Sequence, residues 1–310
     1  MKSNPKENKL YYGKGDVFAY RTYAKPLTGI SHIPESMFTG RHNIILGANI
    51  KVKIGGKAFE PSFVEGENSL VIATDSMKNF IQRHLAYYEG STLEGFSEYV
   101  SKAFFETYSH IDYVSIIAEE IPFTVVSEVS DGSLKASDLV FKKSRNERSR
   151  SSMEMIRMDD ALILSEQSSS IMDLQLIKVS GSSFEDFVEK ELEDSNRPLY
   201  IYLNIHWIYK EQSDAFGETP GKYVAAEQVV DLVTSIFHNT ETTSIQYLLY
   251  EIGCMMLRRF PQLLEVTFES QNHVWETVVT EIPDSDGKVY TEPRPPYSFQ
   301  LFTVTQEHVK

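Results

Sequence analysis

The chain has 310 residues, which exceeds the usual single-core size of about 100 to 200 residues, so two similar domains or one elaborate domain are expected. Apolar residues make up 41% of it and aromatic residues 12%, which excludes the composition of a disordered chain. The formal net charge of −14 argues against nucleic acid as the main partner, because binding a polyphosphate requires an excess of Lys and Arg on one face. A small anionic substrate needs only one or two local cations and remains possible.

Cys254 is the only cysteine, so no intrachain disulfide and no cysteine-cluster metal site can be built from one chain. The eight histidines include no HExxH motif and no pair at helical spacing, which gives a metal site little support. No apolar run approaches the ~20 residues that span a bilayer, and neither end reads as a targeting signal. We therefore expect a cytoplasmic protein without a membrane segment and without a metal.

In the first half, residues 16–23 and 42–54 read as two strands, and the β-branched run 69–73 as a short buried strand. A helix is predicted from Thr74-Asp75 onward, because the apolar period changes there from two to about 3.6 residues. The apolar positions that set this period are Met77, Phe80, Ile81, Leu85 and Tyr88.

A second helix is predicted from Ser91 and Glu94, which have the spacing of a capping box. Its apolar stripe is Leu93, Phe96, Val100 and Phe104. Strand-like text returns at residues 113–118 and 139–142.

The second half repeats this order. Strands are predicted at residues 161–165, 174–179 and 199–207, a helix around Val229, Val230, Val233 and Phe237, a second helix around Ile245, Leu248, Leu249, Ile252 and Met256, and strands at 264–269 and 299–305. Ser244 is placed to cap the second of these helices, and Pro261 ends it.

Strands, two consecutive helices and more strands, occurring twice, predict a duplicated antiparallel α+β unit rather than alternating parallel β-α-β units. The boundary is expected near residue 146, giving domains 1–146 and 147–310. Residues 142–150 are polar, basic and poor in apolar side chains, as an exposed linker would be.

Local chemistry gives two weak signals. The helix start at Thr74-Asp75 presents unpaired amides and a positive dipole end, which favour an anion, although capping of the helix is the commoner role of such residues. Asn272-His273 would place an amide and an imidazole at a strand end, yet both types are also ordinary turn residues. Gly13-Lys14-Gly15 lacks the third glycine of a dinucleotide loop.

Several motifs together resemble the urate oxidase family. They are YGKGDV at 12–17, NSLVIATDSMKN at 68–79, SIQ at 244–246, ESQNH at 269–273 and VYTEPRPPYSF at 289–299. The resemblance implies the tunnelling fold, with two tandem ββααββ repeats that close into a barrel in a homotetramer. It also implies cofactor-free oxidation of urate by dioxygen, at sites formed between subunits.

The resemblance further implies the site residues. The catalytic lysine, threonine and histidine become Lys14, Thr74 and His273. The substrate-binding residues become Thr74, Asp75, Phe184, Arg197, Ile245, Gln246 and Asn272, with Phe184 stacking on the purine, Arg197 holding one edge and Asn272 near dioxygen.

Two features depart from the family pattern. Asp186 replaces a glycine, and the segment between Phe184 and Arg197 is short. Asn272 and His273 are adjacent, so both side chains could serve one site only at a bulge or a strand end. The rivals are a pterin-processing enzyme of the same fold, which a bound zinc would favour, a urate-binding protein without turnover, and a plain interaction protein.

Overall fold

A computed structural model describes residues 10–143, 145–159, 161–182, 197–240, 244–273, 275–292 and 295–309, with the backbone alone for 180–182 and 197. The chain divides into two compact units. Unit 1 comprises the residues up to Ser31, Thr39–Ser169 and Glu211–Tyr223, and unit 2 comprises His32–Phe38, Ser170–Lys210 and the residues from Val224 onward.

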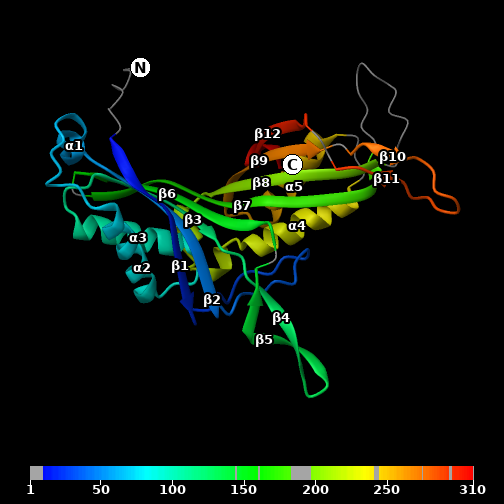
Figure 1. Cartoon of the computed structure of the whole chain (residues 1–310), viewed down its shortest axis with the longest axis horizontal. Helices are drawn as coiled ribbons and strands as arrows, with labels where there is room; N and C mark the ends of the chain where they lie inside the picture. Colours follow the sequence, from blue (N-terminus) through cyan, green and yellow to red (C-terminus); the bar gives the residue numbers. More distant parts are fainter. Residues whose placement is uncertain are drawn as a thin grey trace. The chain divides into compact units, whose positions relative to one another are not determined.

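Unit 1 is an antiparallel sheet with two long helices on one face (Figure 1). Its strands are β1 (Tyr11–Thr22), β2 (Ile45–Gly55), β3 (Tyr113–Glu120), β6 (Arg148–Met158) and the first part of β7 (Ala161–Ser182), which neighbour one another in that order. Its helices are α1 (Glu60–Val64), α2 (Thr74–Tyr87) and α3 (Leu93–Thr107). The hairpin of β4 (Thr124–Ser130) and β5 (Ser133–Lys142) stands apart from this sheet.

The core of unit 1 lies between the sheet and the helices α2 and α3. The helices contribute Met77, Ile81, Leu85, Phe96, Val100 and Phe104, and the strands contribute Ile50, Val52, Ile54, Val114 and Ile116, all buried. The helical residues follow the predicted apolar stripes, and the strand residues alternate as one face of a sheet requires. The predicted helices are therefore confirmed, and their spacing decides which face of the sheet they cover. The predicted capping box of Ser91 and Glu94 is wrong, because the N-cap of α3 is Thr92, whose hydroxyl accepts the Gly95 amide at 3.1 Å.

Unit 2 has the same order of main elements: the second part of β7, β8 (Arg197–Tyr209), α4 (Ala226–Asn239), α5 (Ile245–Arg259), β9 (Leu263–His273) and β12 (Ser298–Thr305). The strands neighbour one another as β7-β8-β9-β12, and β10 (Thr277–Val279) pairs with β11 (Val289–Tyr290). Its core combines Leu203, Ile205, Trp207, Val266 and Phe268 of the strands with Val229, Val233, Leu248, Leu249 and Ile252 of the helices.

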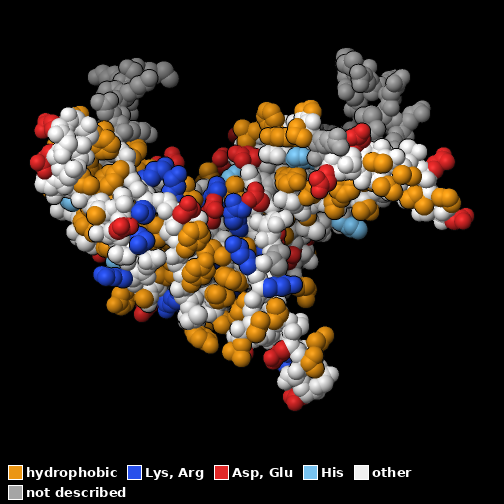
Figure 2. Space-filling model, in the orientation of Figure 1, with side chains coloured by type: hydrophobic (Ala, Val, Ile, Leu, Met, Phe, Trp, Pro, Cys, Tyr) orange, Lys and Arg blue, Asp and Glu red, His pale blue; other side chains and the backbone are white. Residues whose placement is uncertain are grey.

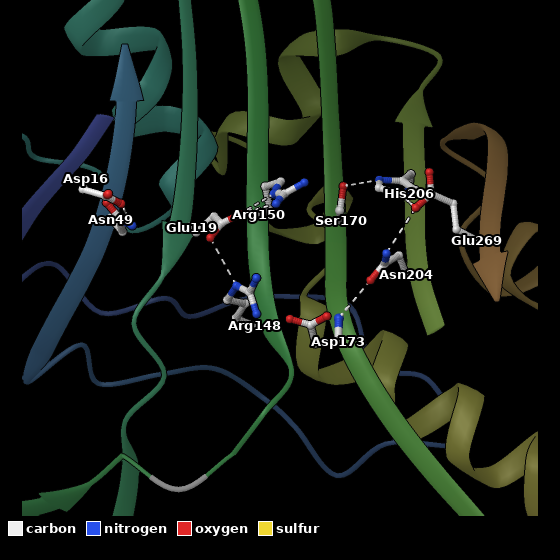
Figure 3. Close-up of polar contacts among 10 residues, drawn as sticks. All are labelled: Asp16, Asn49, Glu119, Arg148, Arg150, Ser170, Asp173, Asn204, His206 and Glu269. Carbon is white, nitrogen blue, oxygen red and sulfur yellow. Dashed lines mark hydrogen bonds and ion pairs between the residues drawn. The ribbon is translucent and has the colours of Figure 1, made fainter. Parts of the chain in front are cut away.

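Three further sequence predictions need correction. Residues 69–73 are not a strand, because only Ile72 is buried and the segment pairs with no strand before α2 begins at Thr74. The second part of the expected linker at 142–150 belongs to β6, where Arg148 and Arg150 pair with Glu119 of β3 (Figure 3). Residues 161–165 and 174–179 are one continuous strand, β7.

The β4–β5 hairpin carries exposed apolar side chains. The hairpin exposes Val129, Leu134 and Leu139, and Figure 2 shows hydrophobic side chains over it.

The boundary between the two units lies between Ser169 and Ser170, inside β7, whereas the predicted boundary at residue 146 lies just before β6. Among the described residues, no helix is long and apolar enough to cross a membrane.

Candidate active site

Lys14 lies at a bulge in β1. The register between β1 and β2 shifts between Lys14 and Val17, and Asp16 within the shift has a left-handed φ of 52°. The Asn49 amide nitrogen donates to Asp16 Oδ1 at 3.1 Å and links the bulged residue to β2 (Figure 3). One residue before Lys14, a Cβ at Gly13 would lie 1.9 Å from the Val52 carbonyl oxygen, so only glycine fits there. The bulge re-aims the side chains that follow the close approach at Gly13.

The helix α2 begins at Thr74, as predicted. Its N-cap is Ala73, and no side chain caps it, so the capping role weighed for Thr74 and Asp75 is wrong. The Ala73 carbonyl accepts from the amides of Ser76 and Met77. Asp75 lies in the first turn, where a carboxylate is favoured by the positive end of the helix dipole.

Lys14 and Asp75 are in contact. Lys14 Nζ donates to Asp75 Oδ1 at 3.3 Å, and Lys78 Nζ lies 3.7 Å from the same oxygen. The Lys14 hydrogen bond, followed by the charges of Lys14 and Lys78, lowers the pKa of the Asp75 carboxyl. The Asp75 side chain is 76% exposed and that of Lys14 34%, so the ion pair faces solvent. The structure thus brings Lys14, Thr74 and Asp75 to one place, the meeting of β1 and α2.

His273 is the last residue of β9 and lies among tyrosine rings. Its ring centroid is 4.4 Å from that of Tyr202 and 5.3 Å from that of Tyr297, which stacks on it. His273 Nε2 is 3.4 Å from Gln271 Oε1. Burial lowers the pKa of this imidazole, so it stays neutral to a lower pH than a free histidine.

Asn272 points to the other face of the sheet. It pairs with Ile201 of β8 and Ser298 of β12 in regular register, whereas His273 pairs with Tyr200. Ile201 is fully buried under the helices of unit 2, so Asn272 shares the helix-covered face and His273 the opposite one. The side-chain carbonyl oxygen of Asn272, Oδ1, is buried and has no hydrogen-bond partner among the described residues. The strand β9 ends at His273 and has no bulge at Asn272. The two adjacent side chains therefore remain on opposite faces.

Ile245 and Gln246 are the first two residues of α5. Ser244 is the N-cap and accepts from the Tyr247 amide at 3.3 Å, which confirms the predicted cap. The Ser244 hydroxyl also donates to Gln246 Oε1 at 2.9 Å. Ile245 is buried and Gln246 exposed, so the amide group of Gln246 is accessible while Ile245 anchors the helix start.

Phe184 and Arg197 are the two remaining predicted residues. Phe184 lies outside the described residues, and Arg197 begins β8 but its side chain is not described. Among the residues that the structure describes, no group of three His, Cys, Asp or Glu side chains could hold a metal ion.

Tyr12 is a residue of this region that the predicted site omits. Its hydroxyl oxygen accepts the Ile72 amide at 2.7 Å, just ahead of α2. The signal for it is its place in the YGKGDV motif, two residues before Lys14.

Comparisons with known proteins agree on one family. The uricase family profile matches residues 167–300. The uric acid degradation bifunctional protein of Bacillus sp. (strain TB-90) is 60% identical over 307 residues, which cover 97% of this chain and 61% of that protein. The uricase of Haloferax volcanii is 44% identical over 302 residues, covering 95% of this chain and 97% of the relative.

Solved structures give the same result. The crystal structure of urate oxidase from Bacillus sp. TB-90 matches with 60% identity and a TM-score of 0.92, covering 96% of this chain and 99% of that one. The crystal structure of a uricase from Bacillus fastidious matches with 53% identity and a TM-score of 0.93, covering 97% of this chain and 95% of that one.

The chain spans 61% of the length of two bifunctional relatives, from Bacillus sp. TB-90 and Bacillus subtilis. It spans nearly all of the Haloferax uricase and of the TB-90 crystal structure, at 44% and 60% identity. Identity of this level over whole chains, with the same fold, shows common descent, and the protein is therefore a member of the uricase family.

Proposed function

We propose that this protein is a urate oxidase, which converts urate, dioxygen and water to 5-hydroxyisourate and hydrogen peroxide without a cofactor. Urate loses two electrons, dioxygen gains them with two protons, and water adds its oxygen to the purine. The observation that carries the proposal is the contact of Lys14 with Asp75 beside Thr74, at the exposed start of a helix. A cation, a hydroxyl and helix amides at one point suit an anionic, flat substrate.

In this reaction the protein mainly moves protons. Lys14 and Thr74 would exchange a proton through the threonine hydroxyl and a water, and His273 would complete the relay on that water. The lowered pKa of His273 favours the neutral imidazole, which can accept a proton near neutral pH. Asp75 and Gln246 are exposed polar groups that would hold edges of the purine.

The remaining roles follow from the family resemblance. Phe184 would stack on the purine face, Arg197 would offer its planar guanidinium to one edge, and the Ile245 amide would hold another. Asn272 would position dioxygen and then water, which requires its buried carbonyl group to face the site in the assembled enzyme.

We propose that the chain forms a homotetramer of the tunnelling fold, with two tandem ββααββ repeats, at 1–146 and 147–310, and sites between subunits. The order strand, strand, helix, helix, strand, strand among the main elements of each unit supports the repeats, and in unit 1 this order is completed by β6 (Arg148–Met158), just beyond residue 146. One cysteine per chain suits the reducing cytoplasm, where we place the reaction. Dilution to monomers should abolish activity, and monomers with full specific activity would refute the shared site.

The direct test incubates purified, chelator-treated protein with urate and dioxygen while urate absorbance and peroxide are followed together. We expect both signals to change in equal molar amounts. Urate binding without peroxide release would identify a urate-binding protein instead, and activity that depends on zinc would favour the pterin-processing alternative.

Thr74→Ala tests the relay. Since Thr74 caps no helix, the variant should fold and bind urate, yet its kcat should fall about 10²-fold, within the usual range for a lost proton-transfer group. Unchanged turnover would remove Thr74 from the relay.

A further inference from the structure

Tyr12 and Lys14 lie on the same face of β1. They pair with Ile54 and Val52 of β2, both of which are buried in the core of unit 1. Side chains alternate along a strand, and residues directly opposite one another share a face. Tyr12 and Lys14 therefore both point toward the side that α2 and α3 cover.

Each of these two residues is tied to one short segment at the start of α2. The Tyr12 hydroxyl oxygen accepts the Ile72 amide at 2.7 Å, and Lys14 Nζ donates to Asp75 Oδ1 at 3.3 Å. Thr74 lies between Ile72 and Asp75. The strand therefore holds the segment on both sides of the threonine, where no side chain caps the helix.

The ring and the hydroxyl of Tyr12 do different things. The ring packs edge-on against Phe59, with centroids 5.0 Å apart, and Phe59 is fully buried. The hydroxyl alone reaches Ile72, a residue that is 7% exposed. Burial raises the pKa of the Tyr12 hydroxyl, so this acceptor is uncharged at neutral pH. A phenylalanine at position 12 would keep the ring contact with Phe59 and remove only the hydrogen bond to the Ile72 amide.

We propose that the Tyr12 hydroxyl is a positioning group for urate oxidation: by holding the Ile72 amide, it fixes the start of α2 so that Thr74 stays within reach of Lys14. This inference rests on the proposed function, because it assigns Tyr12 to the proton relay of that reaction. Tyr12 itself touches neither urate nor dioxygen in this role. The strand β1 thus supplies both the proton-transfer lysine and the group that places its partner.

The test compares Tyr12→Phe with the matched control Tyr88→Phe. The Tyr88 hydroxyl also bonds to the backbone of unit 1, donating to the Thr92 carbonyl at 2.9 Å, but Tyr88 is the C-cap of α2 and so lies at the end of that helix opposite Thr74. Both variants are measured as full-length protein for thermal unfolding, amide hydrogen exchange at Ile72, and kcat and KM for urate.

In Tyr12→Phe we expect a native-like unfolding transition, exchange at Ile72 faster by about tenfold, and a kcat lower by about three- to tenfold, the worth of one hydrogen bond. KM should stay within about twofold, because the substrate-binding groups remain. Tyr88→Phe should keep the exchange at Ile72 and kcat of the parent.

Three results would overturn the inference. Unchanged exchange at Ile72 would show that the hydroxyl holds nothing, and faster exchange with unchanged kcat would show that the tie does not serve turnover. An equal loss of kcat in Tyr88→Phe would indicate general loosening of unit 1. A parent protein that does not oxidise urate would refute the proposed function and the positioning role of Tyr12 together, while the exchange measurement would still show whether the Tyr12 hydroxyl holds the Ile72 amide.

Discussion

The two halves of the candidate site are built differently. In unit 1, Lys14, Thr74 and Asp75 meet at one strand bulge and one helix start, and a hydrogen bond already joins Lys14 to Asp75. In unit 2, His273 and Asn272 lie on opposite faces of β9. The predicted residues of unit 1 therefore lie together, whereas Asn272 and His273 of unit 2 do not share a face of their strand.

The largest expected effect is that of Lys14→Met. The long apolar side chain keeps the packing of the stem and removes the charge, so kcat should fall by about 10²- to 10³-fold while the protein remains folded. The matched control is Lys78→Met, since Lys78 also contacts Asp75 Oδ1, at 3.7 Å. Stopped-flow urate absorbance measures both. Equal losses in the two variants would mean that the charge beside Asp75 matters and the position on the bulge does not.

His273→Gln tests the half in unit 2. We expect kcat to fall by about 10- to 10²-fold, because glutamine keeps a hydrogen-bonding group but cannot take up a proton. Burial lowers the pKa of His273 below its ordinary value of 6.5, so activity of the parent should decline only as the pH falls below 6.5, when the imidazole becomes protonated. A pH profile of kcat checks this. An acid limb that is identical in the variant would belong to another group.

A smaller effect is expected for Asp75→Asn, and it concerns stability against pH. The hydrogen bond from Lys14 lowers the pKa of Asp75 below its ordinary value of 3.8. The ion pair therefore stabilises the fold above pH 3.8, and this contribution disappears as the pH falls through the lowered pKa. The parent should unfold at a slightly higher temperature than the variant at pH 7 and at the same temperature once the pH is below the lowered pKa of Asp75. A difference that persists in acid would contradict this account.

The smallest effect separates the two helix starts that carry site residues. Ser244→Ala removes the side-chain cap of α5 and should lower the free energy of unfolding by about 1 kcal/mol. Thr74→Ala removes no cap from α2 and should change that free energy by less than half as much. Urea denaturation measures both. A larger loss in Thr74→Ala would show that Thr74 stabilises its helix after all.

Much of the fold follows from the sequence because apolar periodicity is a local property. The stripes at Met77 to Leu85 and at Leu93 to Phe104 predict α2 and α3, and the buried face of each helix is the predicted one. The run at 69–73 misled because β-branched residues favour a strand only where a neighbouring strand is free to pair with them. Here the Ile72 amide bonds to the Tyr12 side chain instead.

The basic run at 142–150 shows the same limit for charges. Its composition is that of an exposed linker, yet Arg145 donates to Glu120 at 2.6 Å, and Arg148 continues the run into β6. The pairing glutamates precede it in the chain by 25 residues or more. A local window contains the charges but not their partners, so it cannot tell a solvated run from a paired one.

By itself the sequence determined the residue types of the candidate site, the helices that carry Thr74 and Ile245, and the family, since these depend on identity and local spacing. Tertiary structure decided that Lys14 reaches Asp75 across 61 residues, that Asn272 and His273 face opposite sides, and that the Tyr12 hydroxyl accepts the Ile72 amide just ahead of α2. Those relations depend on strand register and on a bulge, and register is fixed by pairing between distant segments rather than by any one of them.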